Sequence, residues 1–136
     1  VKRMAARGSG VIVNIIGSGG KIASPIHLAG GSANAALMLA TAGLANAYAA
    51  KGVRVVGINP GLTNTSRVSE GLKADAKREG ISEDEAPARA RKKLPLGRLA
   101  EPGEIADIAV FAASARGRFL TGANISADGV STPTVV

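Results

Sequence analysis

His27 is the only histidine in this chain, and it is the side chain best suited to move a proton near neutral pH. It opens the stretch H-L-A-G-G-S-A-N-A-A-L at 27 to 37, just before a predicted helix. One histidine and no cysteine argue against a metal centre and exclude thiolate chemistry, so no metal ligands are assigned. His27 is therefore a candidate general acid or base.

A second candidate site is the loop after a predicted strand, where a Pro-Gly pair is followed by two threonines. The proline ends the strand, the glycine permits a tight turn, and the threonines present hydroxyls and backbone donors. Ligands of open α/β sheets bind beyond the carboxyl ends of the strands. The candidate binding residues are Pro60, Gly61, Thr63 and Thr65.

Alternating strands and helices position these residues. Short apolar runs bounded by turn residues predict buried strands at 10 to 17, 53 to 59 and 123 to 129. Between them the pattern predicts helices at 33 to 50, at 101 to 113, and two short helices around Gly80 within 66 to 93. This order predicts an α/β fold with a parallel sheet.

Composition and charge narrow the class of protein. The 136 residues suit one domain, and 46% of them are apolar. The net charge is +7, but residues 67 to 98 mix nine basic with six acidic side chains, as on a solvated helix surface. With three aromatics in the whole chain, base stacking is almost excluded, so we expect no nucleic-acid partner.

Helix 33 to 50 carries no Asp, Glu, Lys or Arg. Many alanines and few large aliphatic residues argue against a membrane span, and a surface helix would show a charged face. We expect burial on both sides: one face on the sheet (Ala33, Ala36, Leu37, Ala40, Leu44, Ala47) and the other against another subunit (Ala35, Met38, Ala42, Ala45, Ala49). The prediction is a homodimer or homotetramer formed through this helix.

Five segments in order carry a family resemblance: R-G-S-G-V-I-V-N-I, A-N-A-A-L, G-V-R-V-V-G-I-N-P-G-L-T-N-T, P-L-G-R-L-A-E-P-G-E-I-A and L-T-G-A-N-I-S-A-D-G. Together they resemble the C-terminal half of a short-chain dehydrogenase/reductase. The resemblance implies a Rossmann-like, doubly wound parallel sheet and an oxidoreductase that transfers hydride between NAD or NADP and a small carbonyl or alcohol substrate. It also implies that the loop starting at Pro60 holds the nicotinamide. The segment of Pro95, Gly97 and Arg98 and the Asp128-Gly129 pair match as well, and we interpret both as architectural.

The family's catalytic groups do not carry over. Matching A-N-A-A-L to the family motif places the tyrosine position at Gly30, the lysine position at Asn34 and the serine position at Gly17. The only tyrosine, Tyr48, is followed by no lysine four residues on. A rebuilt site would use Ser18 and His27, with Ser18 holding the substrate oxygen and His27 moving the proton.

The Gly-rich dinucleotide fingerprint and its acidic ribose reader are also missing from these 136 residues. The chain begins without methionine, so we expect a C-terminal part (1–136) of one Rossmann-type domain whose N-terminal cofactor half precedes it. The absence of cysteine suits the cytoplasm.

Two alternatives to a divergent reductase stay open. One is a catalytically inactive relative that acts as a partner subunit through the uncharged helix. The other is a basic binding module, which the mixed charge pattern disfavours.

Overall fold

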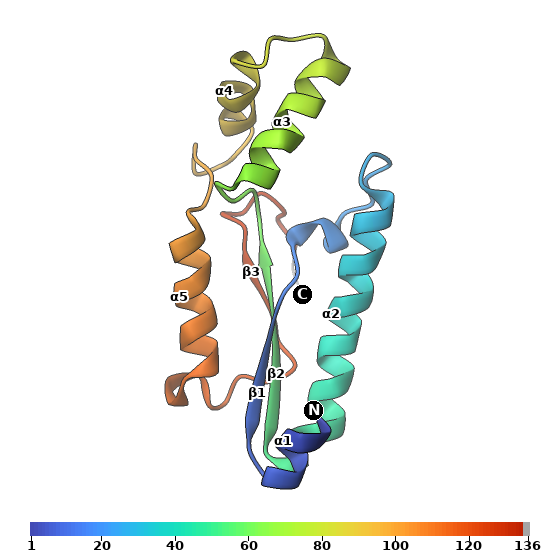
Figure 1. Cartoon of the computed structure of the whole chain (residues 1–136), viewed down its shortest axis with the longest axis vertical. Coiled ribbons are helices and arrows are strands. Elements are labelled where there is room, and N and C mark those ends of the chain that lie inside the picture. The colour runs from blue at the N-terminus through green and yellow to red at the C-terminus, as the bar shows by residue number, and fades with distance from the viewer. Residues whose placement is uncertain (135–136) are drawn as a thin grey trace.

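The computed structural model describes residues 1–134, which form a parallel three-stranded sheet with helices on both faces (Figure 1). The strands lie in the order β1-β2-β3 and are β1 (Gly10–Ile15), β2 (Val53–Pro60) and β3 (Asn124–Ala127). Both strand pairs are parallel. The predicted α/β fold with a parallel sheet is confirmed, although the first strand ends at Ile15 rather than at 17.

Helices and short 3₁₀ turns fill the connections. In chain order they are α1 (Lys2–Arg7), η1 (Ser18–Lys21), α2 (Leu28–Tyr48), η2 (Ala49–Lys51), α3 (Ser66–Glu79), α4 (Glu85–Lys92), α5 (Pro102–Ala113) and η3 (Ala115–Gly117). The two predicted helices around Gly80 are α3 and α4. Gly80 ends α3 with φ 67°, a left-handed conformation that glycine adopts without a steric cost.

The central strand β2 forms the core. Val53, Val55, Val56 and Ile58 are all fully buried. Helix α2 covers one face of the sheet and α5 covers the other (Figure 1). A strand covered on both faces reads as a nearly continuous apolar run, as its sequence predicted.

Arg54 is the charged exception in this strand, and it fixes α5 to the sheet. Its guanidinium donates hydrogen bonds of 2.8 to 3.3 Å to five carbonyl oxygens, those of Ala112, Ala113, Ser114, Gly117 and Leu120. The last carbonyls of a helix lack partners within the helix and carry partial negative charge. A cation at this end therefore caps α5 and joins it to β2.

Two asparagines attach α2 to the opposite face. Asn14 Nδ2 donates to Thr41 Oγ1 at 2.9 Å, and Asn124 Nδ2 donates to the Met38 carbonyl at 3.2 Å. Gly57 lies between them, because it is the register partner of both Asn14 and Asn124. A Cβ at Gly57 would overlap Asn124 Oδ1, so glycine leaves the room that the Asn124 side chain occupies.

Helix α2 differs from its prediction in extent. It begins at Leu28 rather than at 33 and ends at Tyr48, after which η2 follows. The prediction excluded 30 to 32 because glycine and serine disfavour helix interiors. Here the glycine is required by packing, since a Cβ at Gly31 would lie 3.0 Å from the Gly19 carbonyl oxygen of η1.

The predicted faces of α2 were wrong: of the set expected to meet another subunit, Met38, Ala42 and Ala45 are turned to the sheet, whereas Ala35 and Ala49 are exposed. The residues turned to the sheet are buried or half-buried and include Asn34, Met38, Thr41, Ala42 and Ala45. The set predicted to face the sheet is exposed except for Leu44. The prediction followed the aliphatic residues, whereas the polar side chains of Asn14 and Asn124 select the face that carries Thr41 and the Met38 carbonyl.

The outer face of α2 is apolar and uncharged. Leu39 is 76% exposed and Leu37 39% exposed, among alanines. By length and a mean hydropathy of 1.3, Leu28–Lys51 meets the minimum for a membrane span, which is weak evidence because core helices of soluble proteins meet it as well. The outer face is therefore a surface that another protein chain can cover.

We predict that Gly57→Ala destabilises the protein by about 1–3 kcal/mol, because the added methyl group overpacks against Asn124. The measurement is chemical unfolding monitored by circular dichroism. Gly71→Ala on α3 is the matched control: a Cβ there meets nothing within 4 Å, and we expect a gain of about 0.5–1 kcal/mol. If Gly57→Ala costs as much in an Asn124→Ala background as alone, the overlap with Asn124 is not the cause.

Candidate active site

The candidate residues gather at the carboxyl ends of the strands. Strand β1 leads into η1 and then α2, while β2 leads into the loop that starts after Pro60 and enters α3 (Figure 1). Parallel strands end at one edge of the sheet, so both segments lie where α/β proteins bind ligands.

The His27 imidazole lies between two glycines. His27 is the exposed residue immediately before α2. A Cβ at Gly30 would lie 2.6 Å from its Nε2, and a Cβ at Gly19 would lie 3.0 Å from its Cδ2. A side chain at position 30 would displace the ring, and one at position 19 would press against it, so the two glycines favour this placement of the ring.

Asn34 lies one turn after Gly30 on α2 and points back to the end of β1. Its Nδ2 is 3.0 Å from the place where a Cβ at Gly17 would stand. A Cβ at Gly20 would lie 2.7 Å from the Ala35 backbone nitrogen. The glycine-rich turn after β1 thus allows η1 to pack directly on the start of α2.

Ser18 is half-buried at the first position of η1. It stands between Gly17 and Gly19, the two glycines that contact Asn34 and His27. No hydrogen bond joins Ser18 to His27 within residues 1–134. The fold therefore brings the two candidates to one turn without linking their side chains.

The loop from Pro60 to Thr65 is held by its own hydroxyls. Thr63 Oγ1 donates to the Gly61 carbonyl at 3.2 Å, and Thr65 Oγ1 accepts from the Val68 amide at 3.4 Å as the N-cap of α3. A Cβ at Gly61 would stand 3.0 Å from the Asp128 Cα, so the loop passes close to the end of β3. These contacts fix the shape of the loop.

Sequence reasoning missed a polar group beside this loop. Asn59 is fully buried, and neither of its amide atoms has a hydrogen-bond partner among the described residues. Its register partner on β3 is Ser126, whose Oγ accepts a hydrogen bond of 2.9 Å from Lys21 Nζ. Lys21 and Ser126 are 105 positions apart in the sequence, so no local sequence pattern could predict this contact.

Comparison with known proteins identifies the family to which this chain belongs. A family model described as "Enoyl-(Acyl carrier protein) reductase" matches residues 1–130. The cis-4-hydroxycyclohexanecarboxylate dehydrogenase of Sinomonas cyclohexanicum is 36% identical over 129 residues, which are 95% of this chain and 47% of that protein. The acetoacetyl-CoA reductase of Shinella zoogloeoides is 37% identical over 93% of this chain and 48% of its own length. The chain belongs to the short-chain dehydrogenase/reductase family.

Solved structures of this family agree with the fold. A short-chain dehydrogenase from Francisella tularensis superposes with a TM-score of 0.85 at 33% identity, over 91% of this chain and 51% of that one. The actinorhodin polyketide ketoreductase with NADPH superposes with a TM-score of 0.90 at 26% identity, over 96% of this chain and 50% of its own. The chain thus spans about half the length of the short-chain dehydrogenases that it matches.

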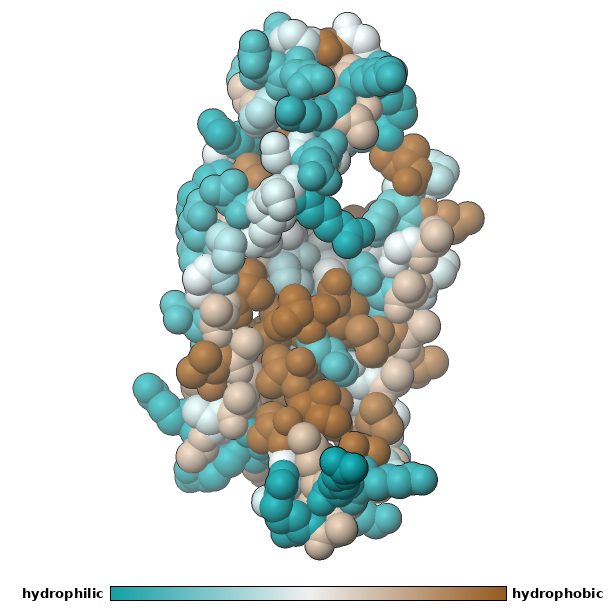
Figure 2. Space-filling model, in the orientation of Figure 1, coloured by the Kyte–Doolittle hydropathy of each residue, from teal (hydrophilic) through white to brown (hydrophobic). Residues whose placement is uncertain are grey.

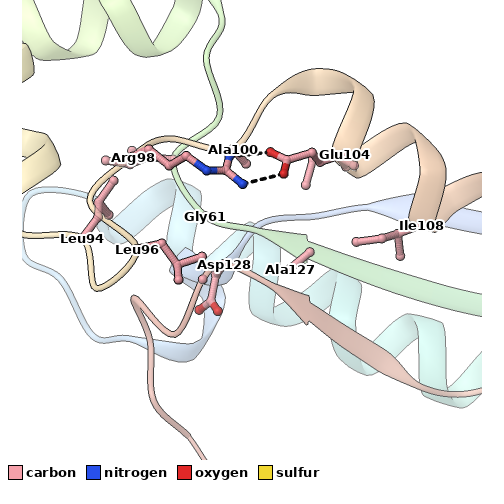
Figure 3. Close-up of a pocket in the computed structure, with 12 residues that line it drawn as sticks. Gly61, Leu94, Leu96, Arg98, Ala100, Glu104, Ile108, Ala127 and Asp128 are labelled. Atoms are coloured by element: carbon pink, nitrogen blue, oxygen red, sulfur yellow. Dashed lines mark hydrogen bonds and ion pairs between the residues drawn. The ribbon is translucent and has the colours of Figure 1, made fainter.

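A separate pocket of about 180 Å³ lies on the α5 side of the sheet, between the loop after β2 and α5 (Figure 3). Apolar side chains line it, and a bidentate ion pair crosses its rim: Arg98 Nη1 and Nη2 lie 2.7 and 2.6 Å from the Glu104 carboxylate. Glu104 also accepts the Glu101 amide at 2.8 Å and completes the capping box of α5. These contacts support an architectural role for the Arg98 segment.

The Arg98 hydrogen bond, followed by the Glu101 amide, lowers the pKa of Glu104 from 4.5 to about 2. A depressed carboxyl pKa contributes stability that is fully present above the unfolded pKa and is lost as the pH falls toward the folded one. We therefore predict that Glu104→Gln flattens the loss of stability between about pH 4.5 and pH 2. The control is Asp107→Asn on the same helix. Equal acid sensitivity of wild type and Glu104→Gln in unfolding curves would contradict this assignment.

Proposed function

We propose that the protein is a nicotinamide-dependent oxidoreductase that interconverts a carbonyl and an alcohol, with His27 as its acid/base. The observation that carries the proposal is the imidazole lying against Gly30, the position where the family places its tyrosine. Glycine in place of the tyrosine removes one proton donor, and it leaves the space that the His27 imidazole occupies. The relatives named above are dehydrogenases and reductases, which supports the same reaction class.

In the direction of reduction, His27 donates a proton from a ring nitrogen to the substrate oxygen, and in oxidation it accepts that proton. Ser18, one residue from the family's serine position, donates a hydrogen bond to the same oxygen. When bound, NAD or NADP supplies or accepts the hydride. Asn34 stands at the lysine position but carries no charge, so it can orient a neighbour without lowering its pKa.

The residues present fit the nicotinamide end of the cofactor. Pro60, Gly61, Thr63 and Thr65 form the loop that would hold the ring, and the unpartnered amide of Asn59 lies immediately before it. The pyrophosphate end requires a Gly-rich turn that these residues lack. We propose that a preceding N-terminal half supplies it.

The free edge of the sheet supports such a half. β1 pairs only with β2 in the described part of the chain, and Ile15 at its end is 53% exposed. Figure 2 shows hydrophobic residues gathered in the middle of this view, between α2 and α5. An edge of this kind presents unpaired backbone N–H and C=O groups that a further strand can pair with.

We predict that His27→Ala in the full-length protein lowers kcat by about 10²- to 10⁴-fold, because a positioned acid/base contributes that much. Turnover is measured with a panel of ketones and alcohols and both coenzymes, and coenzyme binding is measured by fluorescence. Ser9→Ala is the control, because Ser9 is exposed and lies just before β1, at the opposite end of that strand from the proposed site. Unchanged turnover in His27→Ala would exclude His27 as the acid/base.

The second candidate function is an inactive partner subunit, which the missing tyrosine and lysine favour. It predicts coenzyme binding with no turnover by the wild type on any substrate of the panel. A His27→Ala, Gly30→Tyr, Asn34→Lys, Gly17→Ser variant separates the two functions further. If it gains activity that the wild type lacks, the wild-type site has lost its chemistry.

We also propose that the protein assembles as a homodimer or homotetramer through the outer face of α2. This face carries Leu37 and Leu39 among alanines and has no charged residue over its whole length. Alanine and glycine let helices approach closely, and a face of this size without charge is best covered by an identical face across a twofold axis.

Ala36→Glu should therefore shift the protein to monomers, because it buries a charge in the proposed interface. Sedimentation at micromolar concentration measures the effect. Val110→Glu is the matched control: Val110 is an exposed residue of α5, 68% exposed, outside this face. A wild-type protein that sediments as a monomer would refute assembly through α2.

A further inference from the structure

Lys21 is a cation in a region without counter-ions. No Asp or Glu occurs among residues 1–69, and Lys21 is the only Lys or Arg between Arg7 and Lys51. Within residues 1–134 no carboxylate oxygen lies within 4.0 Å of its ammonium. Its partner is the neutral hydroxyl of Ser126, at 2.9 Å. An ammonium can donate three hydrogen bonds, so two remain for a ligand.

The side chain of Lys21 reaches from the end of η1 to β3, across the carboxyl end of the central strand. Ser126 is the register partner of Asn59, and partners in adjacent parallel strands turn their side chains to the same face. The buried amide of Asn59 has no partner among the described residues. Asn59 and Ser126 thus lie on one face of the sheet, and the Lys21 ammonium reaches this face at Ser126.

Lys21 and His27 line the same open pocket of about 270 Å³, together with the hydroxyl-bearing residues Ser24 and Ser32. The remaining lining is backbone and small or apolar side chains. A pocket with a cation, two hydroxyls and no carboxylate favours a ligand that carries negative charge.

From this arrangement we propose that Lys21 is a specificity-determining residue, which selects substrates carrying a carboxylate. The proposal rests on the proposed function, because it assumes that the substrate reaches His27. The carboxylate binds the Lys21 ammonium, while the carbonyl or alcohol lies at His27, which lines the same pocket. Charge-assisted hydrogen bonds of this kind are stronger than neutral ones.

The experiment measures binding by calorimetry on the full-length protein, with keto acids of three to eight carbons and their methyl esters as probes. We expect at least one acid to bind about tenfold tighter than its ester, and raised salt to reduce the difference. Lys21→Met should abolish the preference, and Lys21→Arg should retain it. Inorganic phosphate is a separate arm: if it competes with the acids but the acids do not outbind their esters, the site binds phosphate and not a substrate carboxylate.

Two control variants separate this proposal from the acid/base role of His27 and from a purely structural role of Lys21. His27→Ala should leave the difference in affinity between acid and ester intact. A result that excludes His27 as the acid/base therefore does not test the role of Lys21. Ser126→Ala tests a merely structural bond: if it and Lys21→Met lower thermal stability equally and change acid and ester binding alike, Lys21 only holds η1 to β3. Equal affinity for acid and ester in the wild type, or no binding of either, overturns the proposal.

Discussion

The position of α2 on the sheet is the constraint on which the rest of the site depends. Two strand asparagines bind the middle of the helix, at Thr41 and at the Met38 carbonyl, and Gly57 between them leaves the room that Asn124 needs. Because these hydrogen bonds hold its middle, the helix is fixed both in its rotation about its own axis and in its position along the sheet. That rotation turns the amide of Asn34 toward Gly17 and places Gly30 beneath the ring of His27. A helix held only by aliphatic contacts could slide or rotate by part of a turn, whereas these hydrogen bonds are specific in direction.

The glycines of the site follow from the same constraint. Glycine is costly inside a helix, about 0.5–1 kcal/mol relative to alanine, and α2 holds a Gly-Gly pair in its first turn. Gly30 is occupied by the His27 ring and Gly31 by the backbone of η1. Loss of a catalytic tyrosine alone would leave any small residue acceptable at 30. Contact of the His27 ring with both Gly19 and Gly30 favours glycine at each position, which agrees with the proposal that His27 is the acid/base.

Sequence reasoning reached the architecture because its signals are local. The buried runs of β1 and β2, the Pro-Gly stop after Asn59 and the left-handed Gly80 each predicted an element that the structure contains. The start and the faces of α2 were mispredicted for the opposite reason. They depend on Asn14 and Asn124, which lie on other strands, and on η1, which packs on Gly31. The Lys21–Ser126 contact and the unpartnered amide of Asn59 likewise depend on tertiary structure, so neither composition nor hydrophobic periodicity could predict them.

Helix α2 also couples two properties that would otherwise be independent. Its inner face carries Asn34 and the attachment to the sheet, and the same helix begins at His27. Its outer face is apolar, uncharged and exposed. The inner attachment lies at Met38, Thr41 and Ala45, well past the first turn, so the end that carries the imidazole is held chiefly by η1 and by whatever covers the outer face. Cover over Ala33, Ala36 and Leu37 would stiffen the first turns of the helix, because burial on both sides restricts a helix end that otherwise frays. Assembly through α2 and the placement of His27 are therefore expected to depend on each other.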